Sequence, residues 1–582
     1  MGVLRFFVVL IVASGLFSQT AIFPLRDIRA GQKGIGRTVF SGNKIEEFQV
    51  EVLGVLENIG PKQNVILARL SGGPLEETGV MQGMSGSPVY IDGRLVGAVA
   101  LAFNFAKEPI AGIRPIEEML TVGEQSPVAG GQQRAAAVKR EIPFSPAQAG
   151  KDPGSLIEIA TPVSFSGFTP ETLEHFAPEL KKLGMSPRQG VSSGGPLPNK
   201  MGNPTQLHPG DMISVNLLSG DYAIGAEGTV TQVDGNRVYA FGHRFMSVGE
   251  TELPFARAEV LTLLPNLEAS FKISSPKEWM GTITQDRSTS IYGELGRKAE
   301  TIPLVVSMRD GHRVPLTYHM QLVQDRILSP FILQMAVYSV IDATERTLGL
   351  GSYAVRGAVE FDRGVEPLKL DNAYSGDFNV PAQASLGVAS PLSAVLMAGF
   401  DALKIKEINL AIEASERKQA LQIDQITASR KEVRPGESVD LTVMLTGENG
   451  FEELKTVHYQ VPVGEQAGVL NFTAADGNYS NLLDYQQLAA TVPKSPTQLV
   501  GFLNNLRTNS NAYVRVWRTD PAFQVQGSDL PNPPASLGLI LARAQAAQGS
   551  WLPRGSKVDE LQIPTGDAVV TGSKTVPVEV KE

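Results

Sequence analysis

The stretch Gly83-Met84-Ser85-Gly86-Ser87-Pro88 is followed directly by two apolar, β-rich runs, 89–91 and 95–99. Asp92-Gly93-Arg94 separates the runs, and Asp-Gly between such runs is a strong signal for a β-hairpin turn. We therefore expect Ser85 to lie just before a buried hairpin. Such a hairpin gives this serine the rigid support that a reactive side chain needs.

Ser85 also has the local sequence that a nucleophilic serine needs. A serine hydroxyl is a poor nucleophile at neutral pH, so it requires a neighbouring base and donors aimed at the oxyanion that forms on attack. Gly83 can adopt backbone angles closed to other residues, so its N–H and that of Ser85 can point into one oxyanion hole. The pattern indicates acyl transfer. The alternative for the hexapeptide alone is a structural Gly-Ser turn between strands.

A longer region resembles the SpoIVB-type serine peptidases of bacterial sporulation, in which G-x-S-G-x-P is the chymotrypsin-like serine motif. The resemblance runs over about residues 28–120, and residues 228–243 are similar to the segment with the family's catalytic histidine. It implies a chymotrypsin-like double β-barrel with Ser85 as nucleophile and His243 as base. The segments that carry it in the first region are 40–48, 59–61, 75–88 and 116–120.

Two features depart from the family pattern. In the family the histidine segment precedes the serine segment, whereas Ser85 precedes His243 here, so the two halves are in permuted order. Because geometry defines a Ser-His site, permutation alone does not disable it. Where the family places its aspartate, before the serine, this chain has Leu70-Ser71-Gly72 and no acid.

The acid that orients the imidazole must therefore come from elsewhere. Asp286 is the first choice, because it follows His243 in a region of strands and turns and could reach the imidazole from the same half-barrel. Asp221 is second, and Glu76 or Glu77 are weaker because we expect them on a solvated turn. For each acid the alternative is an exposed charge or a local Asp turn. A Ser-His dyad without an acid also stays open.

Composition excludes several classes of function. The net charge of −9 and the lack of a basic cluster argue against a nucleic-acid partner. The chain has no cysteine and no H-E-x-x-H pair, so we expect no disulfide, no thiol nucleophile, no metal and no cofactor. The 58 glycines and 38 prolines, with Val- and Thr-rich runs between them, favour a mostly β protein.

The N-terminus predicts export. Arg5 precedes the apolar run 6–17, which is too short to span a membrane comfortably and is typical of a signal peptide. We expect a periplasmic or extracellular protein with no stable membrane span after signal cleavage. An uncleaved N-terminal anchor is the alternative.

Composition shifts along the chain divide it into segments. The alternating run Val439–Leu445, with 458–462 as its partner strand, predicts an immunoglobulin-like β-sandwich near the C-terminus. The expected segments are a signal peptide (1–21), the Ser-bearing half (22–125), a linker and insert (126–208), the His-bearing half (209–371), a connecting β region (372–423), the sandwich (424–482), an α/β region (483–545) and a mobile tail (546–582).

Two functions from different classes fit these observations. The first is a secreted serine endopeptidase that cleaves a protein or peptide substrate in the bacterial envelope. The second is a catalytically inactive, peptidase-like scaffold that binds an envelope protein partner, which the missing family aspartate favours.

Overall fold

The fold is described from a computed structural model. It describes residues 21–582 except 104, 125–154, 184, 190–196, 198–199, 311–313, 345–350, 377–378, 416–419, 490–494, 521, 526–527, 532, 535, 538, 541–549, 553–555 and 567. The predicted signal peptide, except residue 21, and residues 126–154 of the predicted linker and insert lie outside these residues. The chain divides into two compact units, which are described separately.

The first unit contains a closed barrel that carries Ser85. Strands β4, β1, β2, β3, β6 and β5 are neighbours in that order, and β4 also pairs with β5, so the sheet closes on itself. Every second residue of β2 from Phe48 to Val52 is buried, as the period of a strand with one core face requires. The strands are β1 (Lys33–Ser41), β2 (Lys44–Gly60), β3 (Gln63–Ser71), β4 (Pro88–Ile91), β5 (Arg94–Phe103) and β6 (Ile110–Pro115), with β7 (Leu156–Glu158) added beside β5.

A second barrel in the same unit carries His243. Its strands β10, β13, β14, β15, β12 and β11 are neighbours in that order, and β11 also pairs with β10. The two barrels therefore have the same topology when their strands are taken in chain order. The strands are β10 (Met212–Gly220), β11 (Ala223–Asp234), β12 (Arg237–Ala240), β13 (Gly249–Leu264), β14 (Phe271–Arg287) and β15 (Ser290–Leu295), with β8 (Pro162–Ser166) added beside β11 and β9 (Ser186–Gln189) beside β8.

Apolar packing holds the two barrels together. Helix α2 (Ile116–Glu124) follows the last strand of the Ser-bearing barrel, and its residues Ile116, Met119 and Val122 share one buried cluster with Tyr239 and Tyr292 of the other barrel. The short helix α1 (Leu75–Thr78) lies in the segment between β3 and Ser85.

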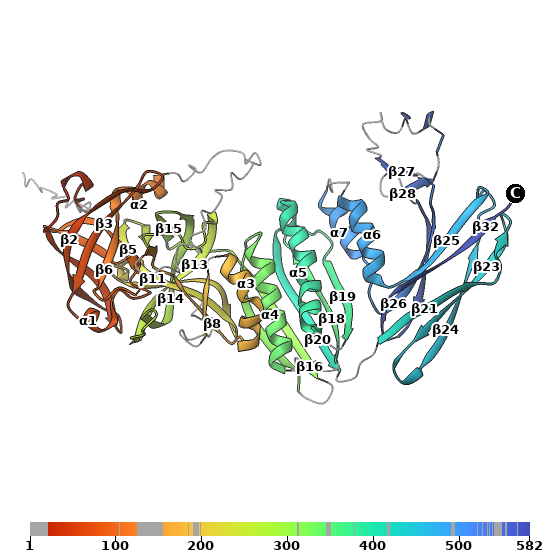
Figure 1. Cartoon of the computed structure of the whole chain (residues 1–582), viewed down its shortest axis with the longest axis horizontal. Helices are drawn as coiled ribbons and strands as arrows, with labels where there is room; N and C mark the ends of the chain where they lie inside the picture. The colour runs from red at the N-terminus through yellow and green to blue at the C-terminus, as the bar shows by residue number, and fades with distance from the viewer. Residues whose placement is uncertain are drawn as a thin grey trace, which may run out of the picture. The chain divides into compact units, whose positions relative to one another are not determined.

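The second unit begins with a sheet covered by helices. Strands β19, β18, β20, β16 and β17 are neighbours in that order, and α4 and α5 pack together against them (Figure 1). The elements are β16 (Thr301–Asp310), β17 (Leu316–Val323), α4 (Leu328–Thr344), β18 (Gly351–Phe361), β19 (Leu368–Gly376), α5 (Val380–Ala398) and β20 (Ile405–Ser415); α3 (Pro170–Lys182) precedes them in the chain. Helix α5 is long and apolar enough to cross a membrane, yet one face of it is buried against α4, β18 and β19.

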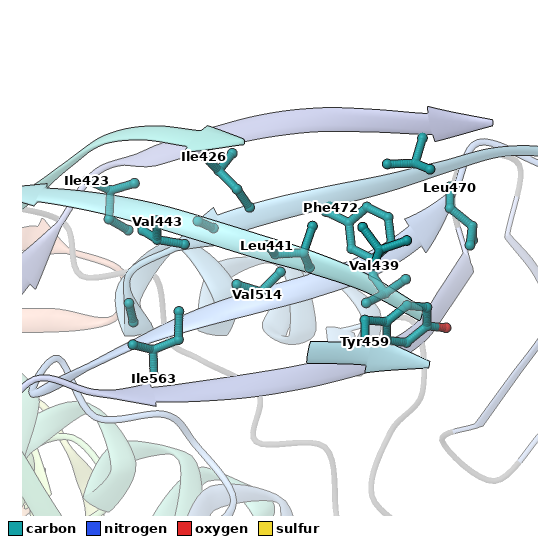
Figure 2. Packing of buried hydrophobic residues seen from close by; sticks show 14 of the residues in the cluster. Ile423, Ile426, Val439, Leu441, Val443, Tyr459, Leu470, Phe472, Val514 and Ile563 are labelled. Carbon is teal, nitrogen blue, oxygen red and sulfur yellow. The ribbon is translucent and has the colours of Figure 1, made fainter. Parts of the chain in front are cut away.

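The C-terminal part of this unit is a β-sandwich. One sheet has the order β24-β23-β21-β31 and the other β22-β32-β25-β26-β30, and their inner faces share one apolar core (Figure 2). The strands are β21 (Ala420–Ala428), β22 (Glu432–Val433), β23 (Ser438–Thr446), β24 (Glu452–Gln460), β25 (Gly468–Ala475), β26 (Asn511–Arg518), β30 (Ser556–Pro564), β31 (Val569–Thr571) and β32 (Ser573–Val580). Helices α6 (Gly477–Ala489) and α7 (Pro496–Asn504), the small sheet of β27 (Ala522–Val525), β28 (Ser528–Pro531) and β29 (Ser550–Leu552), and the short 3-10 helices Leu25–Asp27, Pro204–Gln206, Asp401–Leu403 and Glu448–Gly450 complete the described elements.

The predicted fold class is confirmed: the protein is mostly β, with chymotrypsin-like barrels and a C-terminal sandwich. Some predicted segments differ from the structure. The region 372–423, expected to be a connecting β region, includes helix α5, and its strand β20 pairs with β16 and β18. The tail, expected to be mobile, supplies β30, β31 and β32 to the sandwich, because its alternating valines fill inner positions of the core.

Candidate active site

The backbone of the serine loop leaves two amides free. The loop lies between α1 and β4, and Gly83 and Gly86 have φ of 90° and 95°, in the region that favours glycine. Among the described residues, the N–H groups of Gly83 and Ser85 donate no hydrogen bond. The other amides of the motif do: Met84 N to Met81 O (3.2 Å), Gly86 N to Val99 O (2.8 Å) and Ser87 N to Met84 O (2.9 Å). The two amides predicted to form the oxyanion hole are thus the ones without acceptors.

Strand β11 of the other barrel holds this loop. Thr229 N donates to Ser85 O at 2.8 Å, and its hydroxyl donates to Gly83 O at 2.8 Å. The hydroxyl of Thr231 donates to Gly86 O at 2.7 Å. A Cβ on Gly86 would lie 2.0 Å from Thr229 O, so only glycine allows this close approach. The contact places Ser85 against the strand whose hairpin partner leads to His243.

The segment before His243 has an unusual backbone. Phe241 and Gly242 both have φ of 70°, which costs a residue other than glycine about 1–3 kcal/mol. The Phe241 ring, fully buried, is accommodated because Gly228 has no side chain: a Cβ there would lie 2.3 Å from the ring. A Cβ on Gly242 would lie 3.2 Å from that of Ala98 in the Ser-bearing barrel. Packing therefore fixes the direction in which the chain enters His243.

The imidazole of His243 is oriented by a main-chain carbonyl. Its Nδ1 lies 2.6 Å from Arg244 O, and since a carbonyl only accepts, Nδ1 carries the proton and Nε2 has the lone pair. Burial lowers the pKa of His243, and the charges of Arg114 and Arg244 act in the same direction, against Glu158 and the bond to the carbonyl. The neutral form with a basic Nε2 is thus favoured at neutral pH.

Ser85 Oγ and His243 Nε2 are both buried, and neither has a hydrogen-bond partner in the part of the chain that the structure describes. They are therefore not bonded to each other. Ser85 is 0% exposed and His243 is 2% exposed. The neighbouring Ser87 also has an unpartnered hydroxyl. The arrangement is a closed one, and a substrate can reach Ser85 only after a local movement.

Asp286 contacts the loop after His243 rather than the imidazole. Its Oδ1 accepts from Phe245 N at 2.8 Å, and its Oδ2 accepts from Met246 N at 2.7 Å and Val248 N at 3.2 Å. Burial raises the pKa of this carboxyl, and the backbone donors oppose that rise. Asp286, predicted as the third member of the site, thus holds the loop that begins at Arg244. The Arg244 carbonyl, and not Asp286, accepts the hydrogen bond from Nδ1 of His243.

The other predicted acids lie away from this constellation. Glu76 and Glu77 are exposed on α1. Asp221 belongs to the second unit, where its Oδ2 accepts from His319 N at 2.7 Å. Within the described ranges no group of three or more His, Asp or Glu side chains is placed to hold a metal ion.

Two ion pairs that involve residues of the Ser-bearing barrel lie beside the histidine segment. Arg114 of β6 is 1% exposed and donates from Nε to Gly242 O at 3.4 Å, while its other end pairs with Glu118 at 3.5 Å. Arg244 pairs through Nε with Glu158 of β7 at 3.1 Å. Both arginines raise the local positive potential near the imidazole, which is why their charges lower its pKa.

The sequence did not single out Arg114, and it did not single out Lys272, which packs beside Gly83. The available signal was weak: each is one charged residue within an apolar strand, Gly112-Ile113-Arg114-Pro115 and Phe271-Lys272-Ile273. Such a residue at a core position is expensive unless it is paired or functional. The role of the Arg244 carbonyl has no sequence signal, because every residue has a carbonyl.

Comparison with known proteins supports the assignment of the serine segment. Residues 16–120 match the model of the family described as SpoIVB peptidase S55. No curated protein and no solved structure matches the chain. The permuted order of the two segments stays a prediction, because the match covers the serine segment and not residues 228–243. The matched region ends within α2 and contains the whole loop of Gly83 to Pro88, which points to a serine peptidase. The predicted resemblance is thus confirmed over this region: the Ser-bearing barrel is similar in sequence to the SpoIVB-type serine peptidase family.

Proposed function

We propose that the protein is a serine endopeptidase in which Ser85 is the nucleophile, His243 is the base, and the amides of Gly83 and Ser85 bind the oxyanion. The observation that carries the proposal is the set of groups left without partners. Buried polar groups are almost always hydrogen-bonded. Here Ser85 Oγ, His243 Nε2 and the two amides have no partner among the described residues. The carbonyl oxygens of Gly83, Ser85 and Gly86, in contrast, all accept hydrogen bonds from β11.

These groups suffice for acyl transfer. His243 Nε2 takes the proton from Ser85 Oγ as the Oγ–C bond forms, and the carbonyl oxygen becomes an oxyanion that receives the two amides. The imidazolium then gives its proton to the leaving nitrogen as the peptide C–N bond breaks. A water molecule then attacks the acyl-enzyme, and His243 takes its proton. The Oγ–C bond breaks, Ser85 regains the proton, and the carboxylic acid product leaves. Throughout, Arg244 O accepts from Nδ1–H and keeps the ring in one tautomer.

The closed geometry adds a step before attack. Because Ser85 is 0% exposed, the loop must open locally before a peptide enters. Local opening occurs on timescales of about microseconds to seconds. Labelling of Ser85 by an active-site reagent should therefore proceed, but its rate should decrease as the reagent becomes bulkier.

A fluorophosphonate reagent, which traps an activated serine covalently, tests the proposal. We expect the purified protein without residues 1–21 to be labelled over a time course, and Ser85→Ala and His243→Ala to abolish labelling. Ser87→Ala is the matched control: its hydroxyl is equally buried and unpartnered, yet labelling should persist. A folded wild type that stays unlabelled after prolonged incubation would contradict the proposal.

The second function is an inactive scaffold that binds an envelope protein. The burial of Ser85 and the main-chain carbonyl in place of a carboxylate at Nδ1 favour it. In that case the wild type would stay unlabelled and would behave like Ser85→Ala in every assay of binding. Labelling at Ser85 removes this alternative.

The proposal places the enzyme outside the cytoplasm, with a protein of the bacterial envelope as substrate. It rests on the predicted signal peptide, with Arg5 before the apolar run 6–17. Expression of the full chain in a bacterium, followed by fractionation and intact-mass measurement, tests it. Recovery of the uncut chain from the cytoplasm would contradict export.

A further inference from the structure

Lys272, at the start of β14, is an unusual residue for a barrel interior. It is 1% exposed, its Nζ donates to the Thr38 hydroxyl at 2.7 Å, and the Phe40 ring lies 6.0 Å from Nζ. Among the described residues no carboxylate forms an ion pair with it, and burial alone lowers its pKa to about 7. A buried, unpaired lysine is costly, and a leucine or methionine would fill the same space without that cost.

The side chain of Lys272 lies against the serine loop. A Cβ on Gly83 would be 3.2 Å from Lys272 Cδ and 3.3 Å from its Cβ and Cγ, so the lysine stem covers the face of this glycine. The ammonium is two bonds beyond that Cδ. The lysine stem therefore packs against the residue whose amide is free for the oxyanion.

The backbone around Lys272 braces the same loop. Lys272 N donates to Gln82 O at 3.2 Å, and Gln82 N donates to Ser270 O at 2.8 Å. The Ser270 hydroxyl donates to Thr78 O at 2.7 Å. These bonds tie the loop from Thr78 to Gly83 to the His-bearing barrel, so movement of Lys272 would be transmitted to Gly83.

We propose that Lys272 is a positioning residue for the oxyanion hole: its stem sets the direction of the Gly83 amide, and its buried ammonium favours negative charge on the oxygen that this amide binds. The inference rests on the proposed peptidase function. A positive charge acts strongly in a buried site, where water does not screen it. The ammonium faces the Thr38 hydroxyl and the Phe40 ring from β1, and neither group titrates near neutral pH.

Saturation kinetics of fluorophosphonate labelling test this role, because they separate the maximal rate of labelling from the apparent affinity for the reagent. Lys272→Met keeps the stem and removes the charge. We expect its maximal rate to fall about tenfold while its affinity stays within about twofold of wild type. Thr38→Val, which removes the hydrogen-bond partner of the ammonium but leaves the stem on Gly83, should show a smaller fall. Lys277→Met is the matched control: Lys277 lies on the same strand, exposed and paired with Glu259 at 3.4 Å, and this variant should label like wild type.

The pH profile separates a role of the charge from a purely structural one. In the wild type the maximal rate should decrease as pH rises through about 7, because the ammonium loses its proton there. This decrease should be absent in Lys272→Met. A folded Lys272→Met protein with the rate and pH profile of wild type would overturn the inference while leaving the peptidase function intact.

A second measurement does not depend on catalysis. In protein labelled with ¹⁵N-glycine, the Gly83 amide resonance should shift with pH around 7 in wild type and stay constant in Lys272→Met. If the wild type is never labelled by fluorophosphonate but this shift is present, the peptidase proposal fails and the contact of Lys272 with Gly83 stands. A Gly83 resonance that does not respond to pH would overturn the inference directly.

Discussion

The serine loop and the histidine loop occupy equivalent places in the two barrels but are built differently. Each connects the third strand of its barrel to the fourth, β3 to β4 for Ser85 and β12 to β13 for His243. Glycines, main-chain bonds and threonine hydroxyls hold the serine loop. Buried charges hold the histidine loop: Asp286 binds the amides after His243, and Arg114 binds the carbonyl before it.

The difference follows from what each loop has to present. The serine loop offers free N–H groups, and a carboxylate nearby would accept from them and close the oxyanion hole. The histidine loop offers a lone pair on Nε2, whose proton affinity depends on the charges around the ring. Partners without a carboxylate therefore suit the first loop, and charged partners placed away from Nε2 suit the second.

The largest effect is expected from Gly86→Ala, which attacks the serine loop at its closest contact. The new Cβ would lie 2.0 Å from Thr229 O and 2.6 Å from Phe241 N, at a φ of 95°. Overpacking and backbone strain together should lower the free energy of unfolding by about 3 kcal/mol or more. Gly93→Ala is the control, since its φ is 72° but nothing lies within 4 Å of the new Cβ. Urea denaturation compares the two, and an equal loss in both would show that the contact between the barrels contributes little.

The next effect is expected from Asp286→Asn, which weakens the histidine loop. The amide group cannot accept on both sides, so at least one buried N–H of Phe245, Met246 or Val248 loses its acceptor, at about 1–3 kcal/mol. Fluorophosphonate labelling should slow because Arg244 O moves from Nδ1. Asp211→Asn is the control: this buried carboxylate accepts from His208 N at 2.7 Å elsewhere in the barrel. It should lose stability without losing labelling. If both variants label like wild type, Asp286 has no part in orienting the imidazole.

Local patterns predicted much of the fold. The Asp-Gly turn at Asp92 placed a hairpin that the structure contains, β4–β5. The tail was mispredicted because its glycines, prolines and lysines outweighed the alternation of Val576, Val578 and Val580, which only the facing sheet turns into a core.

The site could be predicted only in the part that short motifs specify. Ser85 and His243 have motifs around them, and the structure brings their segments together through Thr229 and Phe241. The groups that tune them have no such motif. Arg114 and Lys272 act through contacts between barrels that are distant in the sequence, and Arg244 acts through a carbonyl, which every residue has. The sequence shows that residue 286 is an aspartate. Whether its carboxylate accepts from main-chain amides or from the imidazole depends on tertiary geometry alone.

Lys272→Met should change the pH dependence of stability as well as of labelling. Burial lowers the pKa of Lys272 to about 7 in the folded state, whereas an unfolded lysine has a pKa of about 10.4. Between these values the unfolded chain binds the additional proton, so this group makes stability rise with pH by up to about 1.4 kcal/mol per unit. In Lys272→Met the free energy of unfolding should lack this contribution to its rise between pH 7 and pH 10. Denaturant titrations at several pH values measure it against Lys277→Met, and identical slopes would show that Lys272 is charged or exposed in the folded protein.

The smallest effect is expected from Arg114→Met, which removes a single charge at the histidine loop and leaves the serine loop unchanged. The positive charge of Arg114 lowers the pKa of His243, so its removal should raise that pKa. In wild type the acid limb of labelling should lie below pH 6.5, since burial lowers the pKa from that value, and in the variant it should move upward. Glu118 keeps the Asn64 amide groups as partners, which limits the structural damage. Arg69→Met, which removes an exposed pair on β3, should leave the limb in place. A limb that stays fixed or moves downward in Arg114→Met would mean that this arginine holds Gly242 without tuning the base, and the charged side of the comparison would then rest on Asp286 alone.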